Sequence, residues 1–307
     1  MDTADVSAER SSRLRPLLRC PQCRGALNGA AGHALDCAAC GVTYDALNGR
    51  PLLMLPQTQR DFGFELKSVH GQRMVEEYGQ VPATASTPRW IAWLRPPTIM
   101  HRYHEDLLRG PSAPLFTGPP GLTLNVGGGP YRVTETEFTL NIGPFANVDL
   151  IADAHNIPLA DASVDNIFSL AVLEHVADPQ QVVAEMLRVL KPGGYLYSEL
   201  PFIFFFHGYP TDYTRFTREG VRRLFAALEE VEIGMTHGPV SAVLQSGNMV
   251  LELLLPARPR LLRKLVNGTY RLLLFPFKYL DLMLRRHPQA HILAGGFYVR
   301  GRKPADA

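Results

Sequence analysis

A short apolar run that leads into three consecutive glycines constrains the fold of this chain more than any other feature of its sequence. Residues 122–126 have the character of a strand, and Gly127, Gly128 and Gly129 follow at once. Glycine has no Cβ, so the backbone can turn tightly there and a ligand can lie against it. A strand that ends in a glycine-rich turn is typical of the nucleotide-binding corner of a doubly wound sheet.

Strand-like and helix-like segments alternate after this turn. A helix is expected at 182–190, after Asp178 and Pro179, which suit an N-cap and a first helical residue. Only residues 143–147 separate the second strand from the third, so the helix that usually crosses between parallel strands should be missing or rudimentary. The alternation predicts an α/β fold with a parallel sheet. Strands after the first are expected at 138–142, 148–154, 164–172 and 195–200.

In combination, four segments resemble the class I S-adenosylmethionine-dependent methyltransferases, and within them the type 11-like group. They are Leu124-Asn-Val-Gly-Gly-Gly129, Asp153-Ala154, residues 168–176 and the turn Arg188-Val-Leu-Lys-Pro-Gly-Gly194. The resemblance implies a Rossmann-like doubly wound, mostly parallel sheet that binds S-adenosyl-L-methionine.

The resemblance also implies which residues contact the cofactor. Asp153 would accept the adenine amino group, and the backbone amide of Ala154 would contact the ring. The family usually has an acidic residue where this chain has Asn125. It usually has another after the second strand, where this chain has Asn141 and Gly143. A cofactor-binding scaffold without activity is therefore one alternative. The implied contacts are Asn125, Val126, Gly127, Gly128, Gly129, Asn141, Ile142, Asp153, Ala154 and Leu170.

Two histidines follow strands at the sheet edge where doubly wound folds place their chemistry. His175 follows the fourth strand, and His207 follows the fifth in a segment with Asp212, which is expected to orient its imidazole. Histidine can remove the proton of a hydroxyl near neutral pH. We therefore expect O-methylation of a sugar, glycolipid or other small-metabolite hydroxyl. The structural alternative for His175 is packing against the cofactor. For His207 it is a hydrogen bond that orders the loop.

All four cysteines lie near the N-terminus, as Cys20-x-x-Cys23 and Cys37-x-x-Cys40 with 13 residues between the pairs. This spacing predicts a closed, structural zinc site in a ribbon module at 17–56, with two disulfides or free thiols as alternatives. The module resembles the small zinc-ribbon activator of certain RNA and protein methyltransferases. RNA methylation is therefore a second alternative, although the net charge of +2 gives no indication of a nucleic-acid partner.

The remaining chain divides into a connector or lid at 57–121 and a methyltransferase domain at 122–303 with a helical insertion at 237–290. Trp90 and Trp93 lie in the connector, in an aromatic cluster that would either roof a substrate pocket or pack between the modules. Proline-rich breaks interrupt this stretch.

The insertion has the composition of a basic amphipathic helix. Lys264, Arg271, Lys278 and Arg285 recur every seven residues and are expected on one helical face, and Pro276 should divide the helix. This pattern predicts peripheral contact of 257–286 with an anionic membrane, with a helical cap on the sheet as the alternative. The polar N-terminus and the lack of any apolar run of about 18 residues predict a cytoplasmic location, with contact at the inner face of the membrane.

Overall fold

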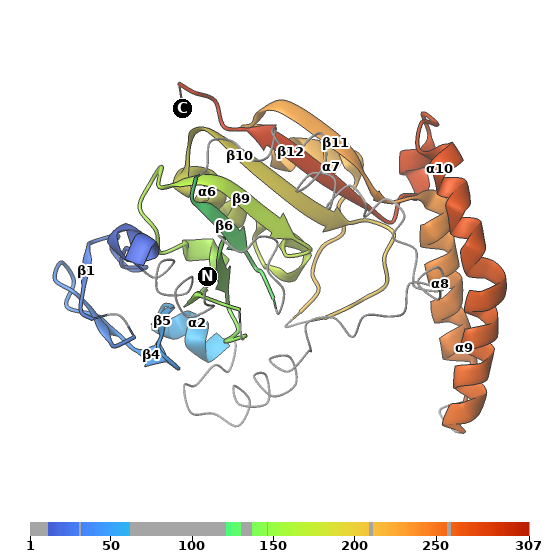
Figure 1. Ribbon diagram of the computed structural model, residues 1–307, viewed down its shortest axis with the longest axis horizontal. Helices are drawn as coiled ribbons and strands as arrows, with labels where there is room; N and C mark the ends of the chain where they lie inside the picture. Colours follow the sequence, from blue (N-terminus) through green and yellow to red (C-terminus); the bar gives the residue numbers. More distant parts are fainter. Residues whose placement is uncertain are drawn as a thin grey trace, which may run out of the picture.

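The computed structural model describes residues 12–30, 32–61, 121–129, 137–145, 147–208, 211–256 and 259–306. The expected connector at 57–121, with Trp90 and Trp93, lies outside these ranges except at its two ends. Within them, the fold is a mixed α/β architecture around a nine-stranded sheet (Figure 1).

The central strands of this sheet confirm the predicted parallel α/β arrangement. The spatial order is β11-β12-β10-β9-β6-β7-β8-β5-β4. Strands β6 to β10 run parallel to one another, and β12 is antiparallel to both β10 and β11. The bounds are β6 Thr123–Val126, β7 Phe138–Asn141, β8 Leu150–Ala152, β9 Val164–Leu170, β10 Leu190–Pro201, β11 Glu229–His237 and β12 Gly296–Arg302.

Helix α6 (Pro179–Val189) begins as its sequence predicts. The Asp178 side chain accepts hydrogen bonds from the backbone N–H groups of Gln180 and Gln181, and Pro179 is the first helical residue. Helix α7 (Arg218–Leu224) begins after Thr217, whose side chain accepts from the N–H of Gly220. Between β7 and β8, the described residues 142–145 and 147–149 contain no helix, as expected.

One apolar core joins the sheet, α6 and the N-terminal module. Leu124, Ile167 and Met186 are fully buried in it. Leu18 and Tyr44 of the N-terminal module belong to the same cluster. The module therefore shares the core of the sheet instead of forming a separate one.

The N-terminal module, called the cysteine ribbon below, also extends the main sheet. Its small sheet contains β1 (Leu27–Asn28), β2 (Leu35–Cys37) and β3 (Thr43–Tyr44). Strands β4 (Ala46–Leu47) and β5 (Arg50–Leu53) follow, and β5 pairs in parallel with β8 through Leu52↔Ile151 and Leu53↔Ala152. Helix α2 (Pro56–Asp61) completes this part of the chain.

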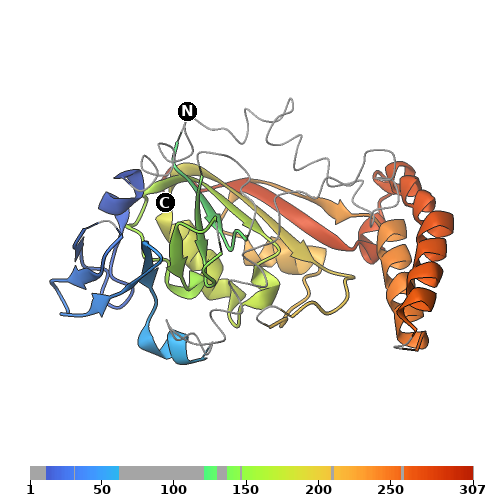
Figure 2. The same cartoon turned by 60° about the horizontal axis from the view of Figure 1, so that its bottom comes forward.

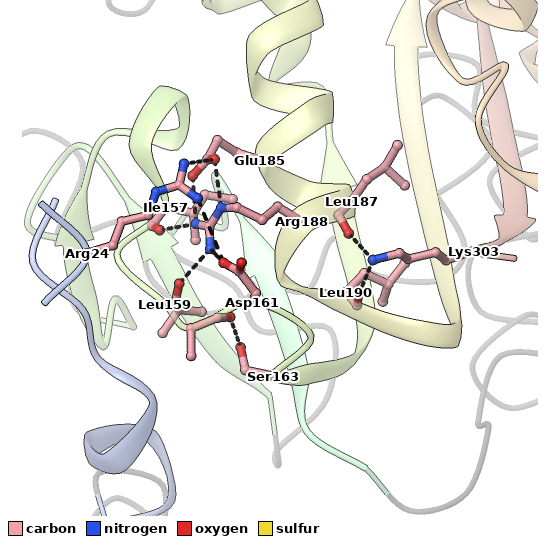
Figure 3. A network of polar contacts seen from close by, with 11 residues as sticks. Arg24, Ile157, Leu159, Asp161, Ser163, Glu185, Leu187, Arg188, Leu190 and Lys303 are labelled. Carbon is pink, nitrogen blue, oxygen red and sulfur yellow. Dashed lines mark hydrogen bonds and ion pairs between the residues drawn. The ribbon is translucent and has the colours of Figure 1, made fainter. Parts of the chain in front are cut away.

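Polar contacts attach the cysteine ribbon to α6 and to the loop 157–161 (Figure 3). Arg24 donates from Nη2 to Oε1 of Glu185 at 2.9 Å. Arg188 also binds Glu185 and donates to the carbonyl oxygens of Ile157 and Leu159. Leu18 forms an antiparallel bridge with Leu159. The ribbon thus holds the loop that follows the carboxyl end of β8.

The C-terminal helices project from the end of the sheet opposite the cysteine ribbon (Figures 1 and 2). Helix α9 ends at Leu274, and Pro276 is the second residue of the 3₁₀ segment that follows, so the predicted break is confirmed. None of the helices among the described residues is long and apolar enough to cross a membrane. The elements are α8 Pro239–Leu254, α9 Arg260–Leu274, η6 Phe275–Leu280, α10 Asp281–Leu284 and η7 Ala290–Leu293.

The prediction that four cations share one helical face is wrong. Lys278 is only 4% exposed, because the change from α-helix to 3₁₀ helix after Leu274 alters the register of the side chains that follow. Burial lowers the pKa of Lys278. Two of the predicted cations, Lys264 and Arg271, line one groove along α9 together with Arg260 and Arg263.

Candidate active site

The glycine turn after β6 forms one wall of a cavity of about 490 Å³. Gly127 has φ +74°, and a Cβ there would meet the side chain of Val172 at 2.3 Å. A Cβ on Gly129 would meet nothing within 4 Å in the part of the chain that the structure describes, and Gly129 lines the cavity. Gly127 is therefore required by the backbone, whereas Gly129 leaves room for a ligand to approach the chain.

Asn141, at the end of β7, holds this turn in place. Its Nδ2 donates to the carbonyl oxygens of Gly127 and Gly128 at 3.0 and 2.9 Å. Its Oδ1 accepts from the N–H of Gly143 at 2.8 Å. Asn141 lines the cavity, but both of its amide hydrogens are used by the turn, so only its carbonyl oxygen remains to meet a ligand hydroxyl.

Asp153 lies at the end of β8, on the cavity wall, and caps the short turn η4 (Ala154–Asn156). Its Oδ1 accepts from the backbone N–H of His155 at 2.9 Å and lies 2.7 Å from that residue's Nδ1. Thr58 of helix α2 donates to Oδ2 at 3.3 Å. Burial raises the pKa of Asp153, but the hydrogen bonds from His155 and Thr58 outweigh burial and lower it. A carboxylate is therefore held at the cavity wall.

Six of the ten expected cofactor contacts line the cavity: Gly127, Gly129, Asn141, Ile142, Asp153 and Ala154. The other four, Asn125, Val126, Gly128 and Leu170, do not. Asn125 is buried, and its Nδ2 donates to Oε1 of Glu137 at 2.9 Å. Leu170 packs against Phe168, Tyr197 and Tyr298.

Sequence reasoning missed several residues of the cavity wall. Ala171 takes a left-handed backbone conformation with φ +53°, which nothing in its residue type indicates. His155 was not singled out, although a histidine two residues after Asp153 suits a carboxylate–imidazole pair. The missed lining residues are Leu140, Phe145, Ala152, His155, Ala171, Val172, Val176 and Gly208.

A cluster of Glu174, His175 and His207 lies at the side of the cavity away from Asp153. His175 and His207 line the cavity, and their rings are nearly perpendicular with centroids 4.9 Å apart. Glu174 has no exposed surface, and its Oε1 lies 3.4 Å from Nε2 of His207 and 3.7 Å from Nε2 of His175. Burial raises the pKa of Glu174 to about 7 and lowers the pKa of His175. The sequence analysis did not nominate Glu174.

Asp212 does not orient the His207 imidazole as expected. Both of its carboxylate oxygens bind the guanidinium of Arg215, and Oδ2 also accepts from the backbone N–H of His207 at 2.8 Å. Nδ1 of His207 lies 3.5 Å from that oxygen and 3.2 Å from the carbonyl oxygen of Phe205. Asp212 therefore fixes the backbone of the loop, and the carboxylate next to the reactive nitrogen Nε2 belongs to Glu174.

The four cysteines have the geometry of a metal site and not of disulfides. Their sulfur atoms all lie within 4.8 Å of one another, with Cys20–Cys40 at 3.6 Å and Cys23–Cys37 at 3.4 Å. A disulfide would require about 2.05 Å. Four thiolates around one zinc at about 2.3 Å lie about 3.8 Å apart. The cluster fits a tetrahedral zinc, with all four positions taken by protein sulfur.

Comparison with known proteins is consistent with this architecture. Residues 136–198 match the family described as a methyltransferase domain. A probable S-adenosylmethionine-dependent methyltransferase of Mycolicibacterium smegmatis is 40% identical over 107 residues, which are 31% of this chain and 42% of that protein. An uncharacterized 37.1 kDa protein in transposon TN4556 of Streptomyces fradiae is 38% identical over 96 residues, 30% of this chain and 28% of that one.

The alignments with these two relatives thus cover less than half of either one's length. Among solved structures, one similar chain is a methyltransferase from Thermotoga maritima that its description calls a possible histamine N-methyltransferase. It is 17% identical, the match covers 70% of this chain and 93% of that one, and the TM-score is 0.41.

Proposed function

We propose that this chain, whose residues 136–198 match the methyltransferase domain family, transfers the methyl group of S-adenosyl-L-methionine to a hydroxyl oxygen. One observation carries the proposal: the cavity beside the glycine turn also has His175 and His207 in its wall. A cofactor bound there would lie beside groups that can accept a proton. Positioning the two reactants supplies much of the rate in such a transfer.

The wall of the cavity fits the cofactor. The methionine part would lie against Gly129, where the chain has no side chain in the way. The adenine would lie near Asp153 and Ala154, with the carboxylate already ionised. Ile142, Phe145 and Val172 supply apolar surface around it. When bound, S-adenosyl-L-methionine supplies an electrophilic methyl group on a sulfonium sulfur.

The acceptor would be a sugar, a glycolipid or another small metabolite. Its hydroxyl oxygen forms the new bond to the methyl carbon, the electrons of the carbon–sulfur bond pass to sulfur, and the hydroxyl proton leaves at the Glu174–His175–His207 cluster. The imidazole nitrogens of His175 and His207 on the cavity wall suit a hydroxyl better than a charged amine, which would first have to lose its proton.

The test is an assay with methyl-labelled S-adenosyl-L-methionine against three extracts: cell-envelope glycolipids, soluble sugars and total RNA. We expect label in a glycolipid or sugar ether, and a loss of about 10²–10⁴-fold in turnover for His207→Ala, as for a missing proton-transfer group. Label in RNA would favour the alternative in which the cysteine ribbon serves an RNA methyltransferase. Tight cofactor binding with no transfer to any extract would favour the inactive scaffold.

The site of action in this proposal is an anionic membrane surface, which the hairpin of α8 and α9 would contact. Its tip exposes apolar side chains that cover nothing among the described residues: Leu253 is 81% exposed, Leu254 77% and Leu261 66%. Next to them, Arg260 and Lys264 are exposed in the basic groove of α9. Leucines that enter the interface beside cations that face lipid phosphates are the pattern of interfacial helices.

The proposal also includes one zinc ion in the cysteine ribbon, held by Cys20, Cys23, Cys37 and Cys40. Because no ligand position is left open, its role would be structural. It would keep the ribbon folded where the ribbon contacts β8 and the loop 157–161.

A further inference from the structure

We infer that Glu174, His175 and His207 bind a divalent metal ion. The three residues come from two segments, η5 (Leu173–His175) and the loop that follows β10. One ligand atom from each lies within 4.8 Å of the others. The site is separate from the cysteine cluster, and its donor atoms are two imidazole nitrogens and a carboxylate oxygen.

Backbone carbonyls fix the tautomer of each histidine. Nδ1 of His175 lies 2.5 Å from the carbonyl oxygen of Thr211, and Nδ1 of His207 lies 3.2 Å from the carbonyl oxygen of Phe205. A carbonyl oxygen only accepts hydrogen bonds, so each Nδ1 carries the hydrogen. In this tautomer each ring presents the lone pair of Nε2. Backbone carbonyls that bind the far nitrogen of a histidine in this way are typical of metal ligands.

Both Nε2 atoms face Oε1 of Glu174, at 3.4 Å from His207 and 3.7 Å from His175. Glu174 is fully buried, and neither of its carboxylate oxygens has a hydrogen-bond partner within the part of the chain that the structure describes. A carboxyl group with no exposed surface and no hydrogen-bond partner among the described residues thus faces the Nε2 atoms of two histidines. Burial of unpaired acceptors is costly, so the arrangement calls for a positive charge between them.

Ligand atoms of a tetrahedral site with bonds of about 2.1 Å lie about 3.4 Å apart, close to the separations seen here. Two histidines and one carboxylate on one side of an ion leave its other positions open. The guanidinium of Arg215 is bound to Asp212 through both of its terminal nitrogens, and neither makes a hydrogen bond to the Glu174 carboxyl.

The ion would give the proposed reaction its acceptor subsite, and this consequence rests on the proposed function. His175 and His207 face the cofactor cavity, so an open position of the ion would face it too. His207 and Glu174 also line a smaller cavity of about 80 Å³ with Glu199 and His237, which lies next to the first. With Nε2 of both histidines bound to the ion, the ion would take the place of a free imidazole base: a hydroxyl bound to it would lose its proton to solvent more readily, as metal-bound water does. The oxygen would then form its bond to the methyl carbon while the carbon–sulfur electrons pass to sulfur.

The test measures binding of Mn²⁺ to the full chain by electron paramagnetic resonance, without cofactor or acceptor. Mn²⁺ prefers oxygen and imidazole ligands over thiolates, so it does not compete for the cysteine cluster. We expect one Mn²⁺ per chain for the wild type, and at least a tenfold loss of affinity for Glu174→Gln and for His207→Gln. His291→Gln is the matched control, since His291 is a partly buried histidine of η7 whose Nδ1 also faces a carbonyl, that of Pro288. It should bind Mn²⁺ as the wild type does.

Folding of each variant is checked by its affinity for S-adenosylhomocysteine, which Glu174→Gln should retain because Glu174 does not line the cofactor cavity. No Mn²⁺ binding by the wild type, or binding that Glu174→Gln leaves unchanged, would overturn the inference and indicate a shared proton instead. Methyl transfer assayed with and without chelator separates the two proposals. Mn²⁺ binding without transfer to any acceptor would remove only the proposed function, and transfer at full rate with chelator would remove only the metal.

Discussion

Arg24 of the cysteine ribbon donates a hydrogen bond to Glu185 of helix α6, with 2.9 Å between Nη2 and Oε1. Glu185 is 7% exposed and also binds Arg188, which reaches the carbonyls of Ile157 and Leu159. This network connects the ribbon to the chain that leaves the cofactor cavity at Asn156. The ribbon is therefore part of the structure that shapes the cavity wall.

Replacing Arg188 by Ala should destabilise the protein by about 3–5 kcal/mol, because it leaves Glu185 buried with only a half-exposed Arg24 as partner and removes the donor to two carbonyls. Urea unfolding measures the change. Arg222→Ala is the matched control, since Arg222 pairs with Glu219 three residues away on the exposed surface of α7, and its loss should cost less than about 1 kcal/mol. If Arg188→Ala lowers the free energy of unfolding no more than Arg222→Ala does, the network does not contribute to stability.

Removal of zinc should weaken cofactor binding although no cysteine touches the cavity. Purified protein should contain about one zinc per chain. Cys37→Ser should lose it, unfold the ribbon and free the loop 157–161. The affinity for S-adenosylhomocysteine should then fall about tenfold, which corresponds to about 1.4 kcal/mol. Stoichiometric disulfides without metal in the wild type, by thiol titration and elemental analysis, would contradict this prediction.

Asp153→Ala should weaken binding of S-adenosylhomocysteine by roughly 5- to 150-fold, since loss of a hydrogen-bonding partner typically costs about 1–3 kcal/mol. Asp153→Asn is the informative companion. It keeps an oxygen that can accept from the N–H of His155, and so keeps the cap of η4. Calorimetry should find Asn intermediate between Asp and Ala. An unchanged dissociation constant for both variants would move the adenine away from this wall.

Arg260→Gln with Lys264→Gln should weaken binding to phosphatidylcholine vesicles that contain phosphatidylserine by about 30-fold, because each cation near such a surface contributes about 1 kcal/mol. Leu253→Ser with Leu254→Ser should also weaken binding, and vesicles of phosphatidylcholine alone should bind the wild type poorly. Arg222→Gln serves as a control for lost charge away from the hairpin. Flotation that is indifferent to these substitutions and to lipid charge would remove the membrane contact.

Local patterns predicted those parts of the fold that short segments determine. The apolar runs that form β6, β9 and β10 are each bounded by polar residues or glycine close to the ends of the run. The pair Asp178-Pro179 is a helix-capping signal that needs no distant partner. The cavity wall at Gly127, Gly129, Asp153 and Ala154 follows from the same local signals, because carboxyl ends of parallel strands meet at one edge.

Contacts between distant segments could not be predicted in this way. Asp212 and His207 are close in sequence, but both carboxylate oxygens of Asp212 bind the guanidinium of Arg215 instead of the His207 imidazole. The partner of His207 is Glu174, which lies 33 positions earlier and becomes buried only when η5 packs against β10. Likewise, a seven-residue spacing cannot show that a 3₁₀ segment will bury Lys278.

The central claim, that S-adenosyl-L-methionine binds beside the glycine turn, is tested most directly by calorimetry of S-adenosylhomocysteine with Gly129→Leu. A Cβ at Gly129 would meet nothing within 4 Å among the described residues, and the longer side chain of leucine should occupy the space beside the turn. Gly268→Leu is the matched control, since a Cβ there also meets nothing within 4 Å but lies on α9. We expect Gly129→Leu to abolish measurable binding of S-adenosylhomocysteine, while the wild type and Gly268→Leu bind it with the same affinity. Wild-type affinity in Gly129→Leu would contradict the claim.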